Sequence, residues 1–304
     1  MGASSLVVTS LIALLASPAP GEKGKLERVS VATLEPSGSA VTVPDSSLGF
    51  SWARRGSTVA FVVKPVATGQ PIRIVDARTL RSRRVIQVGD RDVCGLAFDR
   101  GDLVALVANQ PCYWAKGRFS VVRYDTSSWR ARATLPVPGV RTVFPTNLAF
   151  GDGRAYVARA GAGLDVIDLR TGAAVRRHPR RSLAKGEGIV FTRWLGFHQL
   201  AMGVAVVDVR TWRTRILDPT ARGVGPAGAD LVAYGPHGAA IFTRSGHLRM
   251  RLLTNTDVAV ARVAGRFLYA AEGTSILAHV IDLRTGREAS TSAHANLVWS
   301  LLVP

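Results

Sequence analysis

The chain has 304 residues, of which 47% are apolar and 20% are charged. This composition is typical of a folded domain with a large core and excludes wholesale disorder. The formal net charge of +18 points to anionic partners, among them nucleic acid, anionic lipid and cell-wall polymers.

The first 20 residues carry no charged side chain, and residues 6–16 form an apolar run that gives way to Ser, Pro and Gly. This run is far shorter than the roughly 20 residues of a membrane-spanning helix, and it is typical of a signal-peptide core. We therefore predict a signal-peptide-like leader over residues 1–20, a charged linker over 21–28, and a secreted or envelope-associated protein. An uncleaved segment and a disordered cytosolic leader are the alternatives, because no Lys or Arg precedes the run and the cleavage site is poor.

A short sequence motif recurs through the rest of the chain. It consists of a β-branched run, an Asp, and a Ser or Thr three residues after that Asp. The Asp residues are Asp76, Asp125, Asp168, Asp208 and Asp282. Two less complete copies of the motif keep only the hydroxyl residue and a following glycine, at Ser37-Gly38 and Ser245-Gly246. Successive hydroxyls, from Ser37 to Thr285, are 42, 49, 43, 40, 34 and 40 residues apart. One four-stranded propeller blade occupies roughly 40 to 50 residues.

The polar residues of this motif are typical of a turn. An Asp carboxylate accepts a hydrogen bond from the backbone amide two residues on, a hydroxyl does the same more weakly, and Gly tolerates a positive φ. A β-branched run favours a strand. Each copy therefore predicts a β-hairpin, and we interpret the five Asp residues as structural turn residues.

The repeat resembles the blades of the YVTN-type and WD-repeat-like β-propeller superfamily over about residues 27–304. The Gly-His and Trp-Asp pair of true WD repeats is absent from the sequence. The resemblance therefore implies a fold and says little about activity.

We predict an all-β fold, a single β-propeller domain over residues 29–304 with seven blades. Six units are expected over residues 47–90, 91–138, 139–182, 183–218, 219–254 and 255–292. The seventh blade is composite, with two strands over residues 29–43 around Ser37-Gly38 and an apolar strand over 296–304. The short interval before Ser245 indicates that unit 219–254 has lost most of a strand, replaced by Gly223, Gly225, Pro226 and Gly228. Six blades with a loose terminal arm is the alternative.

The chain has two cysteines, Cys94 and Cys112. An even number is compatible with one disulfide in an oxidising compartment. If Cys94 begins the innermost strand of its blade and Cys112 opens the loop after the second strand, the two lie at the same end of the blade. We therefore expect a disulfide, with two buried thiols as the alternative.

The long interval of 49 residues reflects an extended loop over residues 109–118. Its Tyr113, Trp114 and Lys116 are candidate ligand-binding residues, because functional residues concentrate on loops. The alternative is that the two aromatic rings pack beneath their own loop.

A dense basic run follows between two blades and is expected at the same face as Trp114. From this run we predict Arg180, Arg181 and Lys185 as ligand-binding residues, because Arg guanidinium groups match phosphate and carboxylate geometry. A solvated linker is the alternative.

Other arginines form pairs two residues apart just after the turns, on the expected outermost strands. These pairs are Arg81 and Arg83, Arg130 and Arg132, Arg213 and Arg215, and Arg249 and Arg251. Cations on edge strands oppose edge-to-edge pairing. Because this belt is dispersed, nucleic acid is the less expected partner, and another protein or an anionic cell-envelope polymer or lipid is favoured.

The sequence contains none of the commonest hydrolase, nucleotide-binding and zinc motifs. We therefore predict a monomeric, non-enzymatic binding module, with no catalytic or metal-binding residue assigned and no cofactor specified. The alternative is an enzyme with a site in the propeller channel. Such an enzyme would be a lactonase-like metal hydrolase or a quinone-cofactor oxidoreductase.

Overall fold

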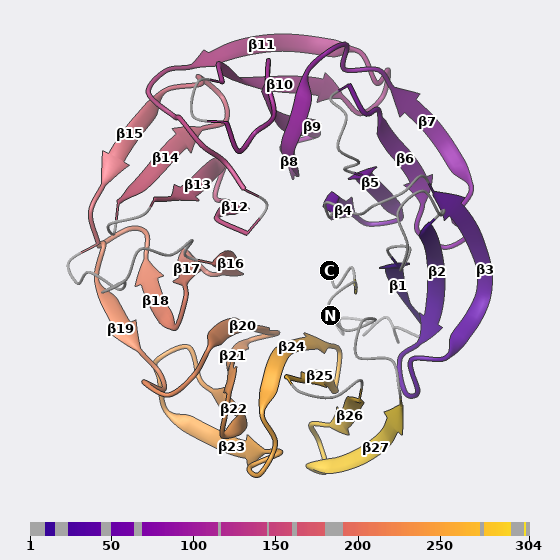
Figure 1. Ribbon diagram of the computed structural model, residues 1–304, viewed down its shortest axis with the longest axis vertical. Coiled ribbons are helices and arrows are strands. Elements are labelled where there is room, and N and C mark those ends of the chain that lie inside the picture. Colours follow the sequence, from indigo (N-terminus) through magenta and orange to yellow (C-terminus); the bar gives the residue numbers. More distant parts are fainter. Residues whose placement is uncertain are drawn as a thin grey trace, which may run out of the picture. The chain divides into compact units, whose positions relative to one another are not determined.

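The computed structural model describes residues 10–15, 24–43, 50–63, 69–114, 117–144, 146–159, 163–179, 191–273, 277–292 and 301. All regular secondary structure in these residues is β-strand, and the strands form seven small antiparallel sheets, the arrangement of a seven-bladed β-propeller (Figure 1). The described stretches contain no helix that is long and apolar enough to cross a membrane.

The chain divides into two compact units. Residues 43–216 of the larger unit form four sheets. Their strands are β4 (Phe50–Arg55), β5 (Thr58–Val63), β6 (Ile72–Asp76) and β7 (Ser82–Ile86); β8 (Asp92–Asp99), β9 (Asp102–Ala108), β10 (Phe119–Asp125) and β11 (Ala131–Val137); β12 (Leu148–Gly151), β13 (Arg154–Ala158), β14 (Leu164–Asp168) and β15 (Ala174–Arg177); β16 (Thr192–Gly196), β17 (Gln199–Met202), β18 (Ala205–Asp208) and β19 (Thr214–Ile216).

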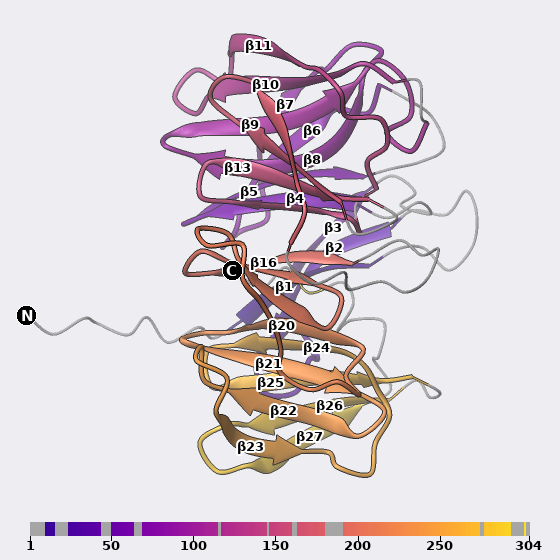
Figure 2. The same ribbon diagram turned by 90° about the vertical axis from the view of Figure 1, so that its left-hand side faces the viewer.

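The other unit combines both ends of the chain with residues 217–292 and forms three sheets. Their strands are β1 (Ser10–Leu15), β2 (Gly24–Ser30) and β3 (Pro36–Val43); β20 (Gly223–Ala227), β21 (Asp230–Gly235), β22 (Gly238–Phe242) and β23 (Leu248–Leu252); β24 (Val258–Ala264), β25 (Phe267–Glu272), β26 (Ala278–Asp282) and β27 (Arg287–Ser292). Figure 2 shows the last two of these sheets packed against each other.

Each of the six predicted units contains one complete four-stranded sheet. The seven-bladed prediction is therefore confirmed, and the six-bladed alternative is wrong.

Apolar clusters lie between consecutive sheets within each unit. The middle strands supply most of their residues, and β9 is buried along its whole length. The outermost strands, in contrast, are largely exposed, as in β7 and β15. A continuous apolar run bounded by turn residues is the pattern of a strand buried on both faces, and this is why the runs before each repeated Asp form the core.

Unit 219–254 has four strands, so the prediction that it had lost most of one is wrong. Gly223, Gly225 and Pro226 lie within β20, which pairs with β21 from Gly223 to Ala227. β20 ends its sheet, and Pro is tolerated on an edge strand because the missing N–H has no partner to lose. A Cβ on Gly223 would lie 2.6 Å from the Tyr234 hydroxyl. Gly223 therefore makes room for a neighbouring ring, and the strand is not broken.

The innermost strand of the first sheet comes from the expected leader. β1 pairs antiparallel with β2 over six residues, which continues the sheet into the expected linker. Leu11, Ile12 and Ala13 are at most 2% exposed. The sequence did not separate this strand from an export signal because both need a short apolar run.

The two ends of the chain share this blade, as predicted for a composite blade. Ala13 forms a bridge with Leu301, and both pack into one apolar cluster. Most of the expected C-terminal strand over residues 296–304 lies outside the described residues, so Leu301 alone represents it.

The turn of the first hairpin lies earlier than predicted. Ser37 and Gly38 are inside β3, and the chain reverses over residues 31–35. The amides of Ala32 and Thr33 donate to Ser30 Oγ at 3.2 and 3.3 Å. Ser30 thus takes the place that Asp has in the other copies, which a search for the hydroxyl-glycine pair overlooks.

The repeated Asp residues close their turns in the same way. In the turns at Asp76, Asp125, Asp168 and Asp208, Oδ1 accepts the backbone amides two and three residues on, at 2.8 to 2.9 Å. At Asp282, Oδ1 accepts the amide of Arg284 at 2.9 Å. These bonds satisfy backbone donors at the point where the strand ladder stops.

The residue after the turn hydroxyl has a left-handed backbone conformation in these turns. Its φ is between 56° and 75° at Leu80, Trp129, Gly172, Trp212 and Gly286. Its amide donates to the carbonyl oxygen of the turn Asp, for example Trp129 to Asp125 at 2.6 Å. Gly adopts this conformation without strain, whereas other residues pay a steric cost. Trp129 and Trp212 offset it by packing their rings against the core between sheets.

The turn at Asp168 predicts a pH-dependent stability. Partial burial acts to raise the pKa of Asp168, but hydrogen bonds from Thr171 and Arg170 outweigh it and the pKa is lowered. A carboxylate with a lowered pKa stabilises the fold above its unfolded pKa, and this contribution is lost as the pH falls. We expect Asp168→Ala to lower the free energy of unfolding by about 1 kcal/mol at pH 7, with wild type and variant converging below about pH 4.

Urea unfolding at several pH values measures this difference. The control is Asp90→Ala, which removes an exposed carboxylate outside the repeated turns and should match wild type throughout. A difference that stays constant from pH 7 to pH 3 would contradict the assignment.

Candidate functional site

The candidate site is the loop between β9 and β10, called here the aromatic loop, of which residues 109–114 and 117–118 are described. It begins where the fully buried β9 ends and returns to the sheet at Phe119. Pro111 and Gly117 interrupt strand geometry inside it, because Pro lacks an amide donor and Gly lacks a side chain to pack. The loop therefore leaves the sheet at a fixed point and carries its side chains outward.

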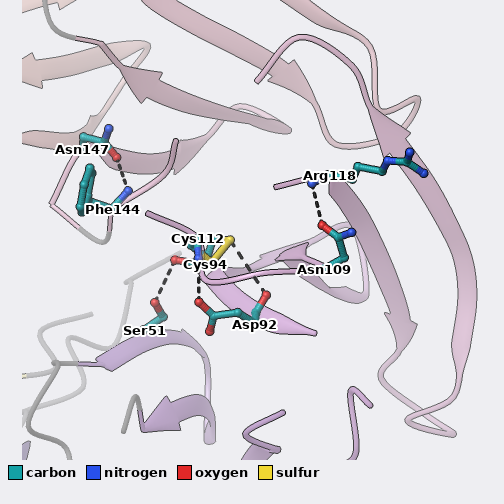
Figure 3. The surroundings of a disulfide bond; sticks show 8 residues. All are labelled: Ser51, Asp92, Cys94, Asn109, Cys112, Arg118, Phe144 and Asn147. Carbon is teal, nitrogen blue, oxygen red and sulfur yellow. Dashed lines mark hydrogen bonds between the residues drawn. A yellow bond between two sulfur atoms is a disulfide. The ribbon is translucent and has the colours of Figure 1, made fainter. Parts of the chain in front are cut away.

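A disulfide holds the aromatic loop to the innermost strand of its own sheet. Cys94 near the start of β8 is bonded to Cys112, with a Cα–Cα distance of 5.5 Å, and both residues are buried (Figure 3). The predicted bond is confirmed, as is the placement of both cysteines at one end of the sheet. The alternative of two free thiols is wrong.

Hydrogen bonds fix the same segment from two further directions. The Cys112 amide donates to Asp92 Oδ2 at 2.9 Å, and its carbonyl accepts the amide of Val143 at 2.8 Å. At the base of the loop the Arg118 amide donates to Asn109 Oδ1 at 2.7 Å. The segment after β11 is thus bonded to the aromatic loop and supports it.

Stacking continues this support to the side chains. The ring of Tyr113 stacks on Phe144 with 6.4 Å between centroids, and the rings of Tyr113 and Trp114 form a T-shaped pair with 6.5 Å between centroids. Asn147 holds Phe144 in turn, because its Oδ1 accepts the Phe144 amide at 2.7 Å (Figure 3). Aromatic pairs at such distances contribute about 0.5 to 1.5 kcal/mol beyond their buried area.

The supported rings nevertheless stay open to solvent. Tyr113 is 45% exposed and Trp114 is 52% exposed. The alternative that both rings pack beneath their own loop is therefore wrong. Arg118 and Arg141, on the two segments that the hydrogen bonds join, are also exposed. The result is a preordered pair of exposed aromatic rings, on segments that also carry exposed cations.

Four of the predicted ligand-binding residues are outside the described part of the chain. They are Lys116, Arg180, Arg181 and Lys185. The structure therefore brings together Tyr113 and Trp114, and the basic part of the predicted site stays a prediction.

One or both arginines of three of the predicted pairs have carboxylate partners. Ion pairs join Arg83 to Asp76, Arg132 to Asp102 and Asp125, Arg249 to Asp230, and Arg251 to Asp218. Exposed pairs of this kind contribute little to stability, but they offset much of the positive charge locally. The net charge of the sequence therefore overstates the basic surface that is open to a ligand.

His279 is a buried titratable side chain in the second unit. Its Nδ1 lies 2.7 Å from Glu288 and its Nε2 lies 2.9 Å from Glu272. Burial opposes the charged form, but the two carboxylates outweigh burial and raise the pKa of His279. Both ring nitrogens are thus occupied within the sheet, which gives this histidine a structural role.

Within the described residues, no three His, Cys, Asp or Glu side chains are grouped closely enough to hold a metal ion. The channel-site enzyme stays an alternative prediction from the sequence.

Sequence reasoning missed Phe144 and Asn147, which support the aromatic loop from the segment after β11. They lie about 30 residues beyond the loop, in a stretch that does not contain the repeated sequence motif. The bond from Val143 to Cys112 and the stacking of Tyr113 on Phe144 show that the two segments are neighbours. No local signal in the sequence carries that information.

No protein-family model matches the chain, and no curated protein matches it. Among solved structures, the chain is similar to a crystal structure of the computationally designed Ika8 protein, with a TM-score of 0.57 and 13% sequence identity. The similarity covers 94% of this chain and 88% of that chain. At this level of identity the likeness shows the fold alone, and the resemblance to the YVTN-type and WD-repeat-like superfamily stays a prediction.

Proposed function

We propose that this protein is an extracytoplasmic binding module that uses the aromatic loop to contact an anionic polymer of the cell envelope. The observation that carries the proposal is the exposure of Tyr113 and Trp114 on a segment fixed by a disulfide, hydrogen bonds and stacking. Exposed aromatic residues on a rigid base bind well because little conformational entropy is lost on binding.

The charge of the ligand is inferred from the arginines around the loop. Arg118 in the aromatic loop and Arg141 in the segment after β11 are exposed, and the predicted basic residues Arg180 and Arg181 are expected at the same face as the loop. Guanidinium groups bind carboxylate, sulfate and phosphate with two parallel hydrogen bonds. A polymer that carries such groups on rings would use both kinds of side chain.

The disulfide supports the proposed location, because such bonds persist in oxidising compartments and are rare in reducing ones. β1 lies within residues 1–20, so we propose that this segment remains attached to the exported protein as a strand. Mass measurement of the protein recovered from the cell envelope or medium tests this. A product that begins after Ala19 would contradict retention.

Binding to heparin, an available sulfated polymer, tests the proposed function. We expect Tyr113→Ala combined with Trp114→Ala to weaken binding about tenfold, or about 1.4 kcal/mol, because interface aromatics contribute most of the binding energy. Arg180→Ser combined with Arg181→Ser should lower both the affinity and its salt dependence. The control is Phe197→Ala, which removes a ring that is 71% exposed on the turn between β16 and β17.

Equal retention of wild type and the aromatic variant would overturn the assignment of the loop. If retention of the protein on heparin does not change with salt concentration, the proposal of an anionic ligand is wrong.

A further inference from the structure

A groove lies between the β4–β7 and β8–β11 sheets, at the opposite end of the β8–β11 sheet from the aromatic loop. The groove has a volume of about 260 Å³ and is lined by Arg55, Thr58, Arg83, Phe98, Thr126 and Trp129. All six residues belong to the larger unit. This groove shares no residue with the aromatic loop.

The two guanidinium groups of the groove differ in their contacts. Arg83 donates to Thr58 Oγ1 at 3.0 Å and to Ser57 Oγ at 3.2 Å, and it is paired with Asp76. Its position is therefore set by its own sheet. Arg55 is exposed and has no hydrogen bond or ion pair to any residue in the described part of the chain. One positive charge at the groove thus lacks a protein counterion.

Arg55 reaches across toward the neighbouring sheet. Its Nη1 lies 3.9 Å from the place that a Cβ would occupy on Gly101, in the turn between β8 and β9. The carboxylates near that turn are already engaged, because Asp99 and Asp102 pair with Arg123. They therefore leave the positive charge of Arg55 uncompensated.

Aromatic side chains form the other part of the groove. Phe98 and Trp129 are half-buried and pack against the core between the two sheets, so their rings are held in place. Thr58 and Thr126 add hydroxyl groups. Apolar rings with a few convergent polar groups are typical of small-molecule sites, although this volume is below the roughly 300 to 1,000 Å³ of larger ligand pockets.

We propose that this groove binds a small organic anion in which a carboxylate or sulfate is attached to a ring, as in a uronic acid. The anionic group pairs with Arg55, with Arg83 as the second guanidinium. The ring lies against Phe98 or Trp129, and its hydroxyls bond to the threonines.

Titration with glucuronate tests the proposal, with the indole N–H resonance of Trp129 as the readout. We expect glucuronate to shift this resonance and leave that of Trp114 unchanged, because Trp114 lies at the other end of the sheet. Glucose tests the need for charge, acetate tests the need for a ring, and glucose 6-sulfate distinguishes a sulfate ligand from a carboxylate. Neutral glucose and ringless acetate should bind at least tenfold more weakly than glucuronate, as expected for loss of a charged hydrogen bond or a stacked ring.

Arg55→Gln should weaken glucuronate binding about tenfold, since it removes a charge-assisted hydrogen bond. The matched control is Arg213→Gln, which removes an exposed arginine just after the turn of another sheet in the same unit and should leave binding unchanged. Equal weakening by both substitutions would overturn the proposal, because it would show general electrostatic attraction. If neither glucuronate nor glucose 6-sulfate shifts the indole resonance of Trp129, the proposal is also wrong.

Discussion

Deletion of residues 1–15 is expected to remove most of the free energy of unfolding of this protein. β1 contributes three residues that are at most 2% exposed and pairs with β2 along its whole length. Complete burial of a large apolar side chain contributes about 1.5 to 3 kcal/mol, and the deletion also opens the edge of β2 to water. The sum approaches the roughly 5 to 15 kcal/mol by which a typical domain is stable.

A substitution in the full-length chain separates this effect from a simple change of length. Ala13→Glu places an uncompensated charge at a position that is 0% exposed and bridged to Leu301. Burial of such a charge is costly, so the variant should also unfold at a much lower urea concentration. Lys25→Ala on β2 removes an exposed side chain and should change the free energy of unfolding by less than about 0.5 kcal/mol.

Circular dichroism during urea unfolding measures all of these variants. If the shortened protein unfolds at the same midpoint as wild type, β1 is dispensable and the first blade is complete without it.

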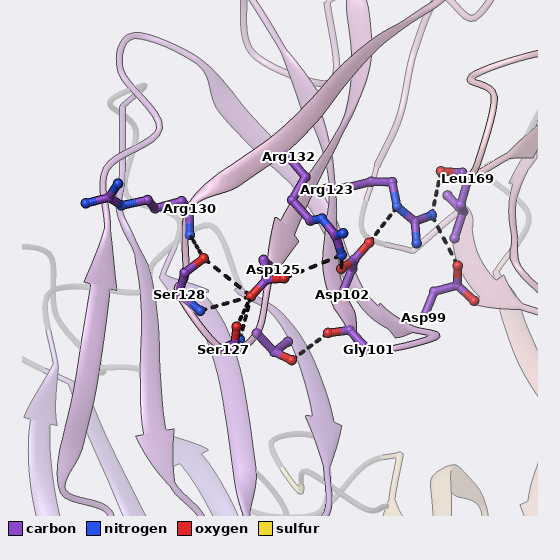
Figure 4. Close-up of polar contacts among 11 residues, drawn as sticks. Asp99, Gly101, Asp102, Arg123, Asp125, Ser127, Ser128, Arg130, Arg132 and Leu169 are labelled. Atoms are coloured by element: carbon purple, nitrogen blue, oxygen red, sulfur yellow. Dashed lines mark hydrogen bonds and ion pairs between the residues drawn. The ribbon is translucent and has the colours of Figure 1, made fainter.

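The second large effect is expected at Arg123, which joins two neighbouring sheets of the larger unit. Its Nε donates to Asp102 at 2.9 Å, and one Nη donates to Asp99 at 3.2 Å and to the carbonyl of Leu169 at 3.0 Å (Figure 4). Its side chain is 13% exposed and that of Asp102 is 10% exposed. Leu169 lies just after β14, so this side chain bonds to the next sheet.

Arg123→Leu is expected to lower the free energy of unfolding by about 3 to 5 kcal/mol, because it leaves Asp99 without its counterion and leaves the largely buried Asp102 with only the exposed Arg132. Arg132→Leu is the matched control: it removes a guanidinium that also pairs with Asp102 but is 61% exposed. That change should amount to less than about 1 kcal/mol.

A double variant tests the mechanism. When Arg123→Leu is combined with Asp102→Leu, the uncompensated charge is removed as well, so part of the loss should be recovered. Losses that simply add would show that the pair does not act as a unit.

The features that the sequence predicts correctly are those that short segments specify. The number of sheets follows from the seven recurring hydroxyls from Ser37 to Thr285, and the disulfide follows from the order of Cys94 and Cys112 within one blade. Each needs only residues of a single hairpin or sheet. The exposed aromatic loop could be identified because it lengthens one interval of the repeat.

The features that sequence reasoning missed depend on segments far apart in the chain. β1 lies about 290 residues from Leu301, its bridge partner, and an apolar run gives no sign of which strand it will join. Gly223 and Pro226 were interpreted as strand breakers because the space that Tyr234 occupies is invisible in the sequence. The anion groove combines residues of two sheets, and neither sheet alone suggests a site.

The Asp turns also bear on how such a chain can change over time. In the turn at Asp168, the amides of Arg170, Thr171 and Gly172 all bond to Asp168, and the amide of Leu169 bonds to the carbonyl of Gly153 in the preceding turn of the same sheet. The backbone bonds that close the turn therefore stay within one sheet. A hairpin with such a turn can be duplicated or exchanged with its geometry intact, while the residues between turns drift under the single demand that they remain apolar. Copies of one ancestral blade would then diverge in sequence until only the turn between two strands is still recognisable. The turn at Ser30 is an example, because a serine there accepts the amide hydrogen bonds that an aspartate accepts in the other copies.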